Sequence, residues 1–407
     1  MAPPEGRLRL LSVFVVLALP ALAHAAAAPL TLPQVLEVAL RENADVRQAH
    51  VHLTAARADQ RAAGALPNPD FSLAPGNPYQ YIWSASLDVG PQRLYRTRAA
   101  SLGTDAAHSD LSDQAQQVSF DVRQAFFDVL LADSLQTLAF EEEDIVRQLT
   151  EADSIRVRAG DLSASELSRS AVELAQVEAA RTHAVAALHR ARLTLQELMG
   201  VAHPDTGFTV SGTLRFEPLD LPLDSVEALA LHSRADLAAA VNRIDQAKEL
   251  QAEARSNVIP IPALSLVHQR DVPFTNGSNY AVGVSLSVPI FDWNGAARER
   301  ASAAAEGARI DEARLRAQIT SAAASAVEDH LTARALASRY ASGVLEQARA
   351  SLESVRYGYA RGTHSLLDLL DALRSYGQVR SDYYNAVHDY WVSAYALTRV
   401  AGKELLP

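Results

Sequence analysis

The sequence is built from two copies of one plan, and this duplication restricts the fold more than any other feature. The segment PLTLPQVLEVALRENADVRQA (29–49) resembles PLDSVEALALHSRADLAAA (222–240). The segment LPNPDFSL (66–73) likewise resembles IPIPALSL (259–266). Self-similarity at a long, nearly constant offset indicates a supersecondary unit that occurs twice in the chain.

The similarity extends into the second part of each copy, where AGDLSASEL (159–167) resembles RGTHSLLDL (361–369). We therefore expect a first repeat over residues 26–202 and a second over residues 222–407. The residues between them, 203–221, form a linker. Each repeat is expected to contain the same helices and strands in the same order.

The positions of proline predict very long helices. No proline occurs in residues 92–203 or 290–406. Proline interrupts helix interiors, so these tracts are the helical ones. Helices over 92–158 and 294–360, each of about 67 residues, would reach roughly 100 Å, a length that requires coiled-coil packing.

The last predicted helix carries the hydrophobic pattern of a coiled coil. Alternating steps of three and four residues are typical of a heptad repeat. One member, Arg380, is polar. The row consists of Leu366, Leu369, Leu373, Tyr376, Arg380, Tyr383, Val387, Tyr390, Ala394 and Leu397. Heptads alone do not indicate a function, so a purely structural coiled-coil stalk remains open at this point.

Each repeat also contains one predicted β-hairpin, at about residues 68–89 and 261–291. Apolar residues alternate there with mostly small or polar ones, which is typical of strands with two different faces. The apolar rows consist of Tyr79, Tyr81 and Trp83 in the first repeat and Tyr280, Val282, Val284 and Leu286 in the second.

Two interpretations fit these rows. They could pack on a helix in an α+β domain, or they could face lipid while the small polar faces line a water-filled lumen, as in a transmembrane β-barrel. The apolar stripes of the long helices are already used in the coiled coil, which favours the barrel.

Four strands cannot close such a barrel. The smallest common one has eight strands, and open sheet edges do not occur in lipid. Two chains would supply about eight strands, which leave an interior filled with side chains, whereas three chains would supply about twelve and leave a passage. The expected fold is therefore mainly α, with a small transmembrane β portion completed by several chains.

The N-terminal residues resemble a secretory signal peptide. Arg7 and Arg9 precede an apolar core, and Ala23-His24-Ala25 is a small-x-small cleavage sequence. We expect residues 1–25 to be removed after export. An uncleaved N-terminal anchor is the alternative interpretation.

Composition and motifs exclude several classes of function. The chain contains no cysteine, which excludes disulfides, thiolate chemistry and a lipid-modified cysteine. Its formal net charge of −11, without a basic cluster, argues against nucleic-acid binding. The histidines are scattered, and no metal-ligand spacing, phosphate-binding loop or catalytic motif occurs in a fitting context. We therefore expect no metal site and no cofactor.

The tandem repeat and three of its segments together resemble the TolC-type outer-membrane factor family. The segments are VSLSVPIFDWNG (284–295), YARGTHSLLDLLDAL (359–373) and YYNAVHDYWVSAYALTRVAG (383–402). The resemblance covers essentially all of the chain after the signal peptide. It implies a homotrimer with a 12-stranded barrel in the outer membrane of a Gram-negative bacterium and an α-helical barrel that crosses the periplasm.

The same resemblance implies the partners. They are a periplasmic adaptor protein, an inner-membrane transporter of the RND or ABC type, and outer-membrane lipid. The chain would be the passive exit duct of a tripartite efflux pump or type I secretion system, without enzyme activity. The linker, 203–221, would lie in the equatorial region. The alternative function is an exported coiled-coil scaffold or stalk, which does not need alternating strands in both repeats.

The family's periplasmic gate maps onto four residues of this sequence. Asp368 and Asp371 resemble carboxylates that ring the closed tip, and their spacing places them on one helical face. Tyr359 resembles a tyrosine in the network that holds the tip shut. The position of His364 is often basic in the family. A histidine there would be charged mainly below about pH 6.5, so we hypothesise that closure depends on pH.

The two aspartates have simpler explanations as well. Ser365-x-x-Asp368 resembles a capping box, as does Ser163-x-x-Glu166 in the first repeat. Capping explains Asp368 without a gate. Asp371, which corresponds to Arg169, could instead pair with a basic residue on a neighbouring helix.

Two glycines mark the predicted turns between the long helices. Gly160 and Gly362 occupy corresponding positions of the two repeats. Glycine supplies the positive φ that a tight turn between helices often needs. The resemblance assigns adaptor docking to these turns, and a plain turn role remains an alternative.

Overall fold

The computed structural model describes residues 29–76, 78–205, 207–270 and 277–406. The predicted signal peptide lies outside these residues. Within the described part of the chain, no helix is long and apolar enough to cross a membrane.

The first half of the chain folds as two helices, a hairpin of two strands and two further helices. Pro91 begins the longest helix directly after Gly90, where the missing N–H of proline has no intrahelical partner to lose. The elements are α1 (Leu32–Glu42), α2 (Ala44–Gly64), β1 (Asp70–Ala74), β2 (Tyr79–Ser86), α3 (Pro91–Ala159) and α4 (Ala164–Leu198).

The second half repeats this order, with additional short segments. The elements are the 3₁₀ turn η1 (Leu223–Ser225), α5 (Val226–Ser233), α6 (Ala235–Ser256), β3 (Pro262–Arg270), β4 (Asn279–Leu286), α7 (Gly295–Arg339), the π turn η2 (Tyr340–Val344), α8 (Leu345–Ala360) and α9 (Leu366–Ala401). The predicted mainly helical fold with a small β portion is confirmed. The repeat boundaries at 26–202 and 222–407 remain predictions.

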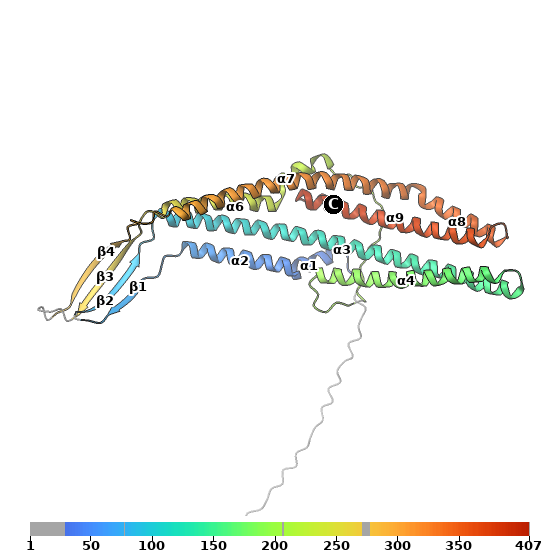
Figure 1. Cartoon of the computed structure of the whole chain (residues 1–407), viewed down its shortest axis with the longest axis horizontal. Helices are drawn as coiled ribbons and strands as arrows, with labels where there is room; N and C mark the ends of the chain where they lie inside the picture. Colours follow the sequence, from blue (N-terminus) through green and yellow to red (C-terminus); the bar gives the residue numbers. More distant parts are fainter. Residues whose placement is uncertain (1–28, 77, 206, 271–276, 407) are drawn as a thin grey trace, which may run out of the picture.

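The molecule is elongated, as Figure 1 shows. The four strands lie at one end, and the turns that join α3 to α4 and α8 to α9 lie at the other. At about 1.5 Å per residue, the 69 residues of α3 span roughly 100 Å. The predicted helix over 92–158 is thus confirmed.

The predicted continuous helix over 294–360 is wrong in one place. The π turn η2 separates α7 from α8, and Gly343 inside it has φ 152° and ψ −22°. Only glycine adopts this backbone conformation readily, since it has no Cβ. The helix axis is therefore interrupted in the second repeat, whereas α3 passes through the corresponding region without a break.

The two hairpins form one antiparallel sheet in the order β1-β2-β3-β4. The central pair joins the two repeats, with Trp83 opposite Leu266. The expected second hairpin, 261–291, is longer than the observed strands. The last pair of β3 and β4 is Pro262 with Leu286, so no partner strand remains for residues 287–291. Strands β1 and β4 are the two edges of the sheet.

The main hydrophobic core lies where α1, α3, α4, α7 and α9 meet in the middle of the molecule. The predicted heptad row of α9 faces inward, and Val387, Tyr390, Ala394 and Leu397 are fully buried. The predicted linker also packs on this core. Tyr390 Oη accepts a hydrogen bond from Leu219 N at 2.8 Å, and the linker's Leu214 is buried.

Candidate functional site

The sheet places its apolar rows on a single face. Residues paired across neighbouring strands point to the same side, and Tyr81, His268 and Tyr280 are such partners. The same holds for Trp83, Leu266 and Val282. All seven predicted apolar residues, Tyr79, Tyr81, Trp83, Tyr280, Val282, Val284 and Leu286, therefore share one face, together with Phe71, Leu73, Leu264 and Leu266.

No helix of the described part of the chain covers this face. Figure 1 shows the sheet beyond the ends of the helices, and Val282 and Val284 are 73% and 69% exposed. The α+β interpretation, in which the apolar rows pack on a helix, is therefore wrong. An exposed apolar surface of this kind indicates a partner or a lipid environment.

Aromatic rings gather at the far end of the same face. The ring centroids of Tyr81 and His268 lie 5.6 Å apart, and those of His268 and Tyr280 lie 4.6 Å apart. Tyrosines at one level of a transmembrane sheet are typical of the boundary between lipid and water. His268 was not predicted from the sequence, because the apolar row of β3 ends at Leu266 and the ring is placed on this face only by pairing with Tyr81 and Tyr280.

The opposite face of the sheet is mostly small and polar, although Ile82 and Val267 also lie on it. Ser84, Ser265 and Gly283 lie side by side across the three strands β2, β3 and β4. Ser265 Oγ donates a hydrogen bond to the carbonyl oxygen of Gly283 at 3.3 Å. A Cβ at position 283 would collide with this hydroxyl, so glycine fits the row without displacing it.

At the other end of the molecule, the turns adopt the predicted glycine conformation. Gly160 has φ 83° and Gly362 has φ 75°, and both end a long helix in the left-handed region. The backbone N–H groups of Asp161 and Thr363 then reach back to carbonyl oxygens in the last turn, at 2.9 Å each. This arrangement gives hydrogen-bond partners to backbone carbonyl oxygens that the end of a helix otherwise leaves unpaired.

The capping interpretation of Asp368 is confirmed. Ser365 Oγ accepts a hydrogen bond from the Asp368 N–H at 3.2 Å, and the Asp368 carboxylate accepts one from the Ser365 N–H at 2.9 Å. These hydrogen bonds to Ser365 hold the pKa of Asp368 below its usual range. Mutual repulsion could raise the pKa values of the Asp368 and Asp371 carboxylates only where three chains bring them to one axis. This effect remains a prediction for the trimer.

The other predicted gate residues lie close to this cap. His364 Nδ1 lies 3.8 Å from the Asp368 carboxylate. Asp371 is exposed and has no ion pair within the described residues. The alternative in which Asp371 pairs with a basic residue on a neighbouring helix therefore finds no support in the single chain.

Tyr359 connects the second repeat to the first. Its hydroxyl donates to Asp153 Oδ1 at 2.9 Å and accepts from Arg156 Nη1 at 3.0 Å, and both partners lie on α3. Burial and the Asp153 carboxylate raise the pKa of Tyr359 to about 12. The phenol therefore stays protonated and keeps its role as donor at neutral pH.

Neither partner of this tyrosine was predicted from the sequence. Asp153 is fully buried, and its Oδ2 has no hydrogen-bond partner in the described structure. A signal was present, since Ala139, Val146 and Asp153 follow one another at heptad spacing on α3. An acid in a row of core positions needs a partner from another helix.

Further polar pairs join the α3–α4 hairpin to α9. Arg380, the polar member of the heptad row, forms an ion pair with Glu141 of α3. His388 Nε2 lies 2.7 Å from Asp128 Oδ1, also on α3. Arg374 forms an ion pair with Glu173 of α4. These contacts connect residues from the two repeats, so their pairing depends on the packing of the two hairpins.

Comparisons with known proteins agree with these features. A family model described as "Outer membrane efflux protein" matches residues 227–403. The "Cobalt-zinc-cadmium resistance protein CzcC" of Cupriavidus metallidurans is 27% identical over 390 residues, which cover 94% of this chain and 93% of that protein.

Solved structures share the fold. The CmeC outer membrane channel of Campylobacter jejuni has a TM-score of 0.81 and 16% sequence identity, with 91% of this chain and 85% of that chain covered. The open MtrE outer membrane channel of Neisseria gonorrhoeae has a TM-score of 0.77 and 20% identity, with 92% and 89% covered.

The family model lies in the second repeat, and the similarity to CzcC extends across both. The duplicated plan, the exposed apolar sheet face, the long helical hairpins and these comparisons all match the outer membrane efflux protein family, the TolC-type outer-membrane factors.

Proposed function

We propose that this protein is the outer-membrane exit duct of a tripartite efflux system. The observation that carries the proposal is the four-stranded sheet, which has one exposed apolar face and one small polar face. A sheet of this kind fits a barrel wall between lipid and a water-filled passage. The long helices that continue from it would extend the passage into the periplasm.

The edges of the sheet support assembly of three chains. β1 and β4 each have one side without a strand partner in the single chain. Since open edges are not tolerated in lipid, β4 of one chain pairs with β1 of the next. Three chains would close a barrel of about twelve strands, whose interior has room for a passage.

The proposed partners meet the opposite end. The turns at Gly160 and Gly362 would dock a periplasmic adaptor, which connects the duct to an RND or ABC transporter in the inner membrane. Asp368, Asp371, Tyr359 and His364 would form the gate at this tip. Transport would be driven by the inner-membrane partner, and the chain itself would be a passive conduit without enzyme activity.

Reconstitution tests the channel directly. Protein purified from outer membranes should migrate as a heat-sensitive trimer and should conduct ions in planar lipid bilayers. An exported scaffold or stalk, the alternative function, would not insert and would give no conductance. The absence of conductance from a well-folded trimer would overturn the proposal.

The relative's name suggests which substrates to test first. Deletion of the gene should lower tolerance to cobalt, zinc or cadmium, and a plasmid copy should restore it. Unchanged tolerance to all three metals would indicate another substrate class. It would not contradict the proposal of a duct, which the reconstitution tests separately.

The proposed dependence of the gate on pH has its own test. His364 lies beside the Asp368 carboxylate, so a charge on the ring would strengthen this contact. Single-channel conductance should then change between about pH 5.5 and 8. The His364→Arg variant should flatten the change, and identical profiles of variant and parent would contradict the idea.

A further inference from the structure

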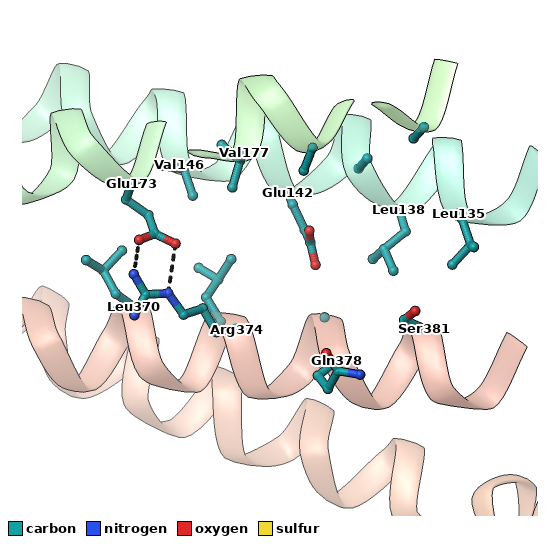
Figure 2. Close-up of a pocket in the computed structure, with 15 residues that line it drawn as sticks. Leu135, Leu138, Glu142, Val146, Glu173, Val177, Leu370, Arg374, Gln378 and Ser381 are labelled. Carbon is teal, nitrogen blue, oxygen red and sulfur yellow. Dashed lines mark hydrogen bonds and ion pairs between the residues drawn. The ribbon is translucent and has the colours of Figure 1, made fainter. Parts of the chain in front are cut away.

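A cavity of about 470 Å³ lies between α3, α4 and α9, on the helical side of the molecule and away from the sheet. Figure 2 shows it between the two hairpins of the chain. Its walls combine charged and polar side chains with an apolar part, which includes Leu135, Leu138 and Val146 of α3, Val177 of α4 and Leu370 of α9. Its volume lies within the range of small-molecule sites in proteins, about 300–1,000 Å³.

One carboxylate in this cavity is unpaired. Glu142 extends from α3 toward α9, as Figure 2 shows, and it forms no hydrogen bond or ion pair within the described residues. Burial raises the pKa of Glu142. The nearby Glu173 differs, because Arg374 binds both of its carboxylate oxygens.

The charged groups around the cavity sum to one negative charge. Arg374 pairs with Glu173, and Arg380 pairs with Glu141. Glu142 is the remaining charge. The cavity therefore favours a positively charged guest over an anion.

The facing helix leaves room for this carboxylate. Gly377 is buried in the middle of α9, and a Cβ there would collide with Glu142 Oε1. Glycine is unfavourable inside a helix relative to alanine, so its presence here needs a reason in the packing. At position 377, the reason is that glycine leaves space for the carboxylate of Glu142.

We propose that this cavity binds an amphipathic organic monocation, with its ammonium group on Glu142 and its apolar body against the leucine and valine side chains. A divalent metal ion fits less well, because no group of three or more acidic, histidine or cysteine side chains suited to a metal lies within the described residues. None of the four proposed gate residues lines the cavity, and binding there goes beyond the proposed function as a duct.

Titration of a matched pair of probes tests the proposal. The cation 1-naphthylmethylammonium and the neutral 1-naphthalenemethanol have the same apolar body. Isothermal titration of the detergent-solubilised protein, with protein-free micelles as the blank, should show saturable binding of the cation. The neutral probe should bind at least about tenfold more weakly, since it cannot pair with the carboxylate.

Variants locate the binding in the cavity. Glu142→Gln should weaken cation binding at least about tenfold, and Gly377→Ala should weaken it by displacing the carboxylate. Glu151→Gln, which removes an exposed carboxylate from the same helix, is the matched control and should leave binding unchanged. Circular dichroism melting checks that each variant is folded.

A dependence on pH gives a further check. The charged groups that face Glu142 are Glu141 of α3, Glu173 of α4, and Arg374 and Arg380 of α9. Cation binding should weaken as the pH falls through the raised pKa of Glu142, at a higher pH than the ordinary glutamate value of 4.5 would give.

Three outcomes would overturn the proposal: no saturable binding of the cation, equal binding of the two probes, or an unchanged affinity in folded Glu142→Gln. The comparison of the two probes on the unmodified protein decides the question even if the variants do not fold.

Discussion

At the scale of single residues, the tip depends on a tyrosine that serves two helices. Tyr359 of α8 donates to a buried aspartate of α3 and accepts from an arginine of the same helix. Its ring also lies against that guanidinium, with 5.5 Å between the Arg156 carbon and the ring centroid. The hydroxyl is therefore the polar link between α8 and α3 at the end of the molecule where the gate is proposed.

Removal of this hydroxyl should weaken the tip. Tyr359→Phe leaves the fully buried Asp153 without its donor, which should lower the free energy of unfolding by about 1–3 kcal/mol. Urea denaturation measures the loss, and bilayer recordings should show more frequent opening. Tyr357→Phe is the control, because this side chain is 60% exposed and two residues away on the same helix. Equal effects of the two variants would contradict a specific role for Tyr359.

His388 should make stability depend on pH. Burial alone would lower its pKa, but hydrogen bonds to Asp128 and Asp389 outweigh burial and raise the pKa. Because the pKa of His388 is higher in the folded state, the charged ring stabilises the fold. This contribution is complete below the pKa of the unfolded state, about 6.5, and it is lost as the pH rises through the pKa of the folded state. His388→Asn should therefore lower the free energy of unfolding by about 1–3 kcal/mol at pH 5–6 and by less at pH 9.

Denaturant unfolding at both pH values measures this difference. His50→Asn, which changes an exposed histidine of α2, is the control and should show little effect at either pH. A loss for His388→Asn that is the same at both pH values would show that packing, and not the charge, is responsible.

At the scale of elements, the two long hairpins differ in how much of them the sequence determines. Proline-free tracts predicted α3 and α4, and the heptad row predicted the buried side of α9, because both signals are local. The π turn at Tyr340–Val344 was not predicted, since a single glycine within a helical pattern is compatible with an unbroken helix. Capping boxes at Ser163 and Ser365 were predicted, because they require only neighbouring residues.

The turns between the long helices should not accept side chains. Gly160→Ala or Gly362→Ala should cost about 1–2 kcal/mol of unfolding free energy, because both positions have a positive φ. The methyl group of an alanine at either position would meet no atom within 4 Å, so backbone strain alone is responsible. Thermal or urea unfolding measures the cost.

Gly307→Ala is the matched control for these turns. This glycine lies inside α7 and also has open space around it, so alanine should stabilise the helix by up to about 1 kcal/mol. A destabilising Gly307→Ala, or neutral changes at the turns, would contradict the assignment of strain to the left-handed conformation.

At the scale of the whole molecule, the sheet and the helices have different requirements for assembly. The helices bury their apolar stripes within one chain, around a core that both repeats share. The sheet leaves one apolar face and two edges open. The single chain is therefore folded along most of its length and incomplete at the end proposed to lie in the membrane.

A charge on the apolar face should prevent insertion and leave the helices folded. Val282→Lys should cost about 2–4 kcal/mol of insertion free energy if the side chain lies near the middle of the membrane. The heat-sensitive trimer should then disappear from outer-membrane fractions. Ser285→Lys on the opposite face of β4 is the control, because its side chain points to the proposed lumen. Insertion of both variants alike would contradict the lipid-facing assignment.

The sequence by itself determined the features that depend on local spacing. The duplicated plan, the extent of α3, the alternation of the strands and the glycine turns follow from periodicity and from the backbone preferences of proline and glycine. The resemblance to the outer-membrane factors also followed from these features, since the tandem repeat and its segments occur together.

Only the tertiary structure decided which residues meet across the two repeats. The pairing of β2 with β3, the contact of Tyr359 with Asp153, and the cavity that holds Glu142 opposite Gly377 join positions far apart in the chain. Such contacts depend on the rotation and register of whole helices and strands against each other. A one-residue change in register would replace every partner, and no local pattern in the sequence specifies that register.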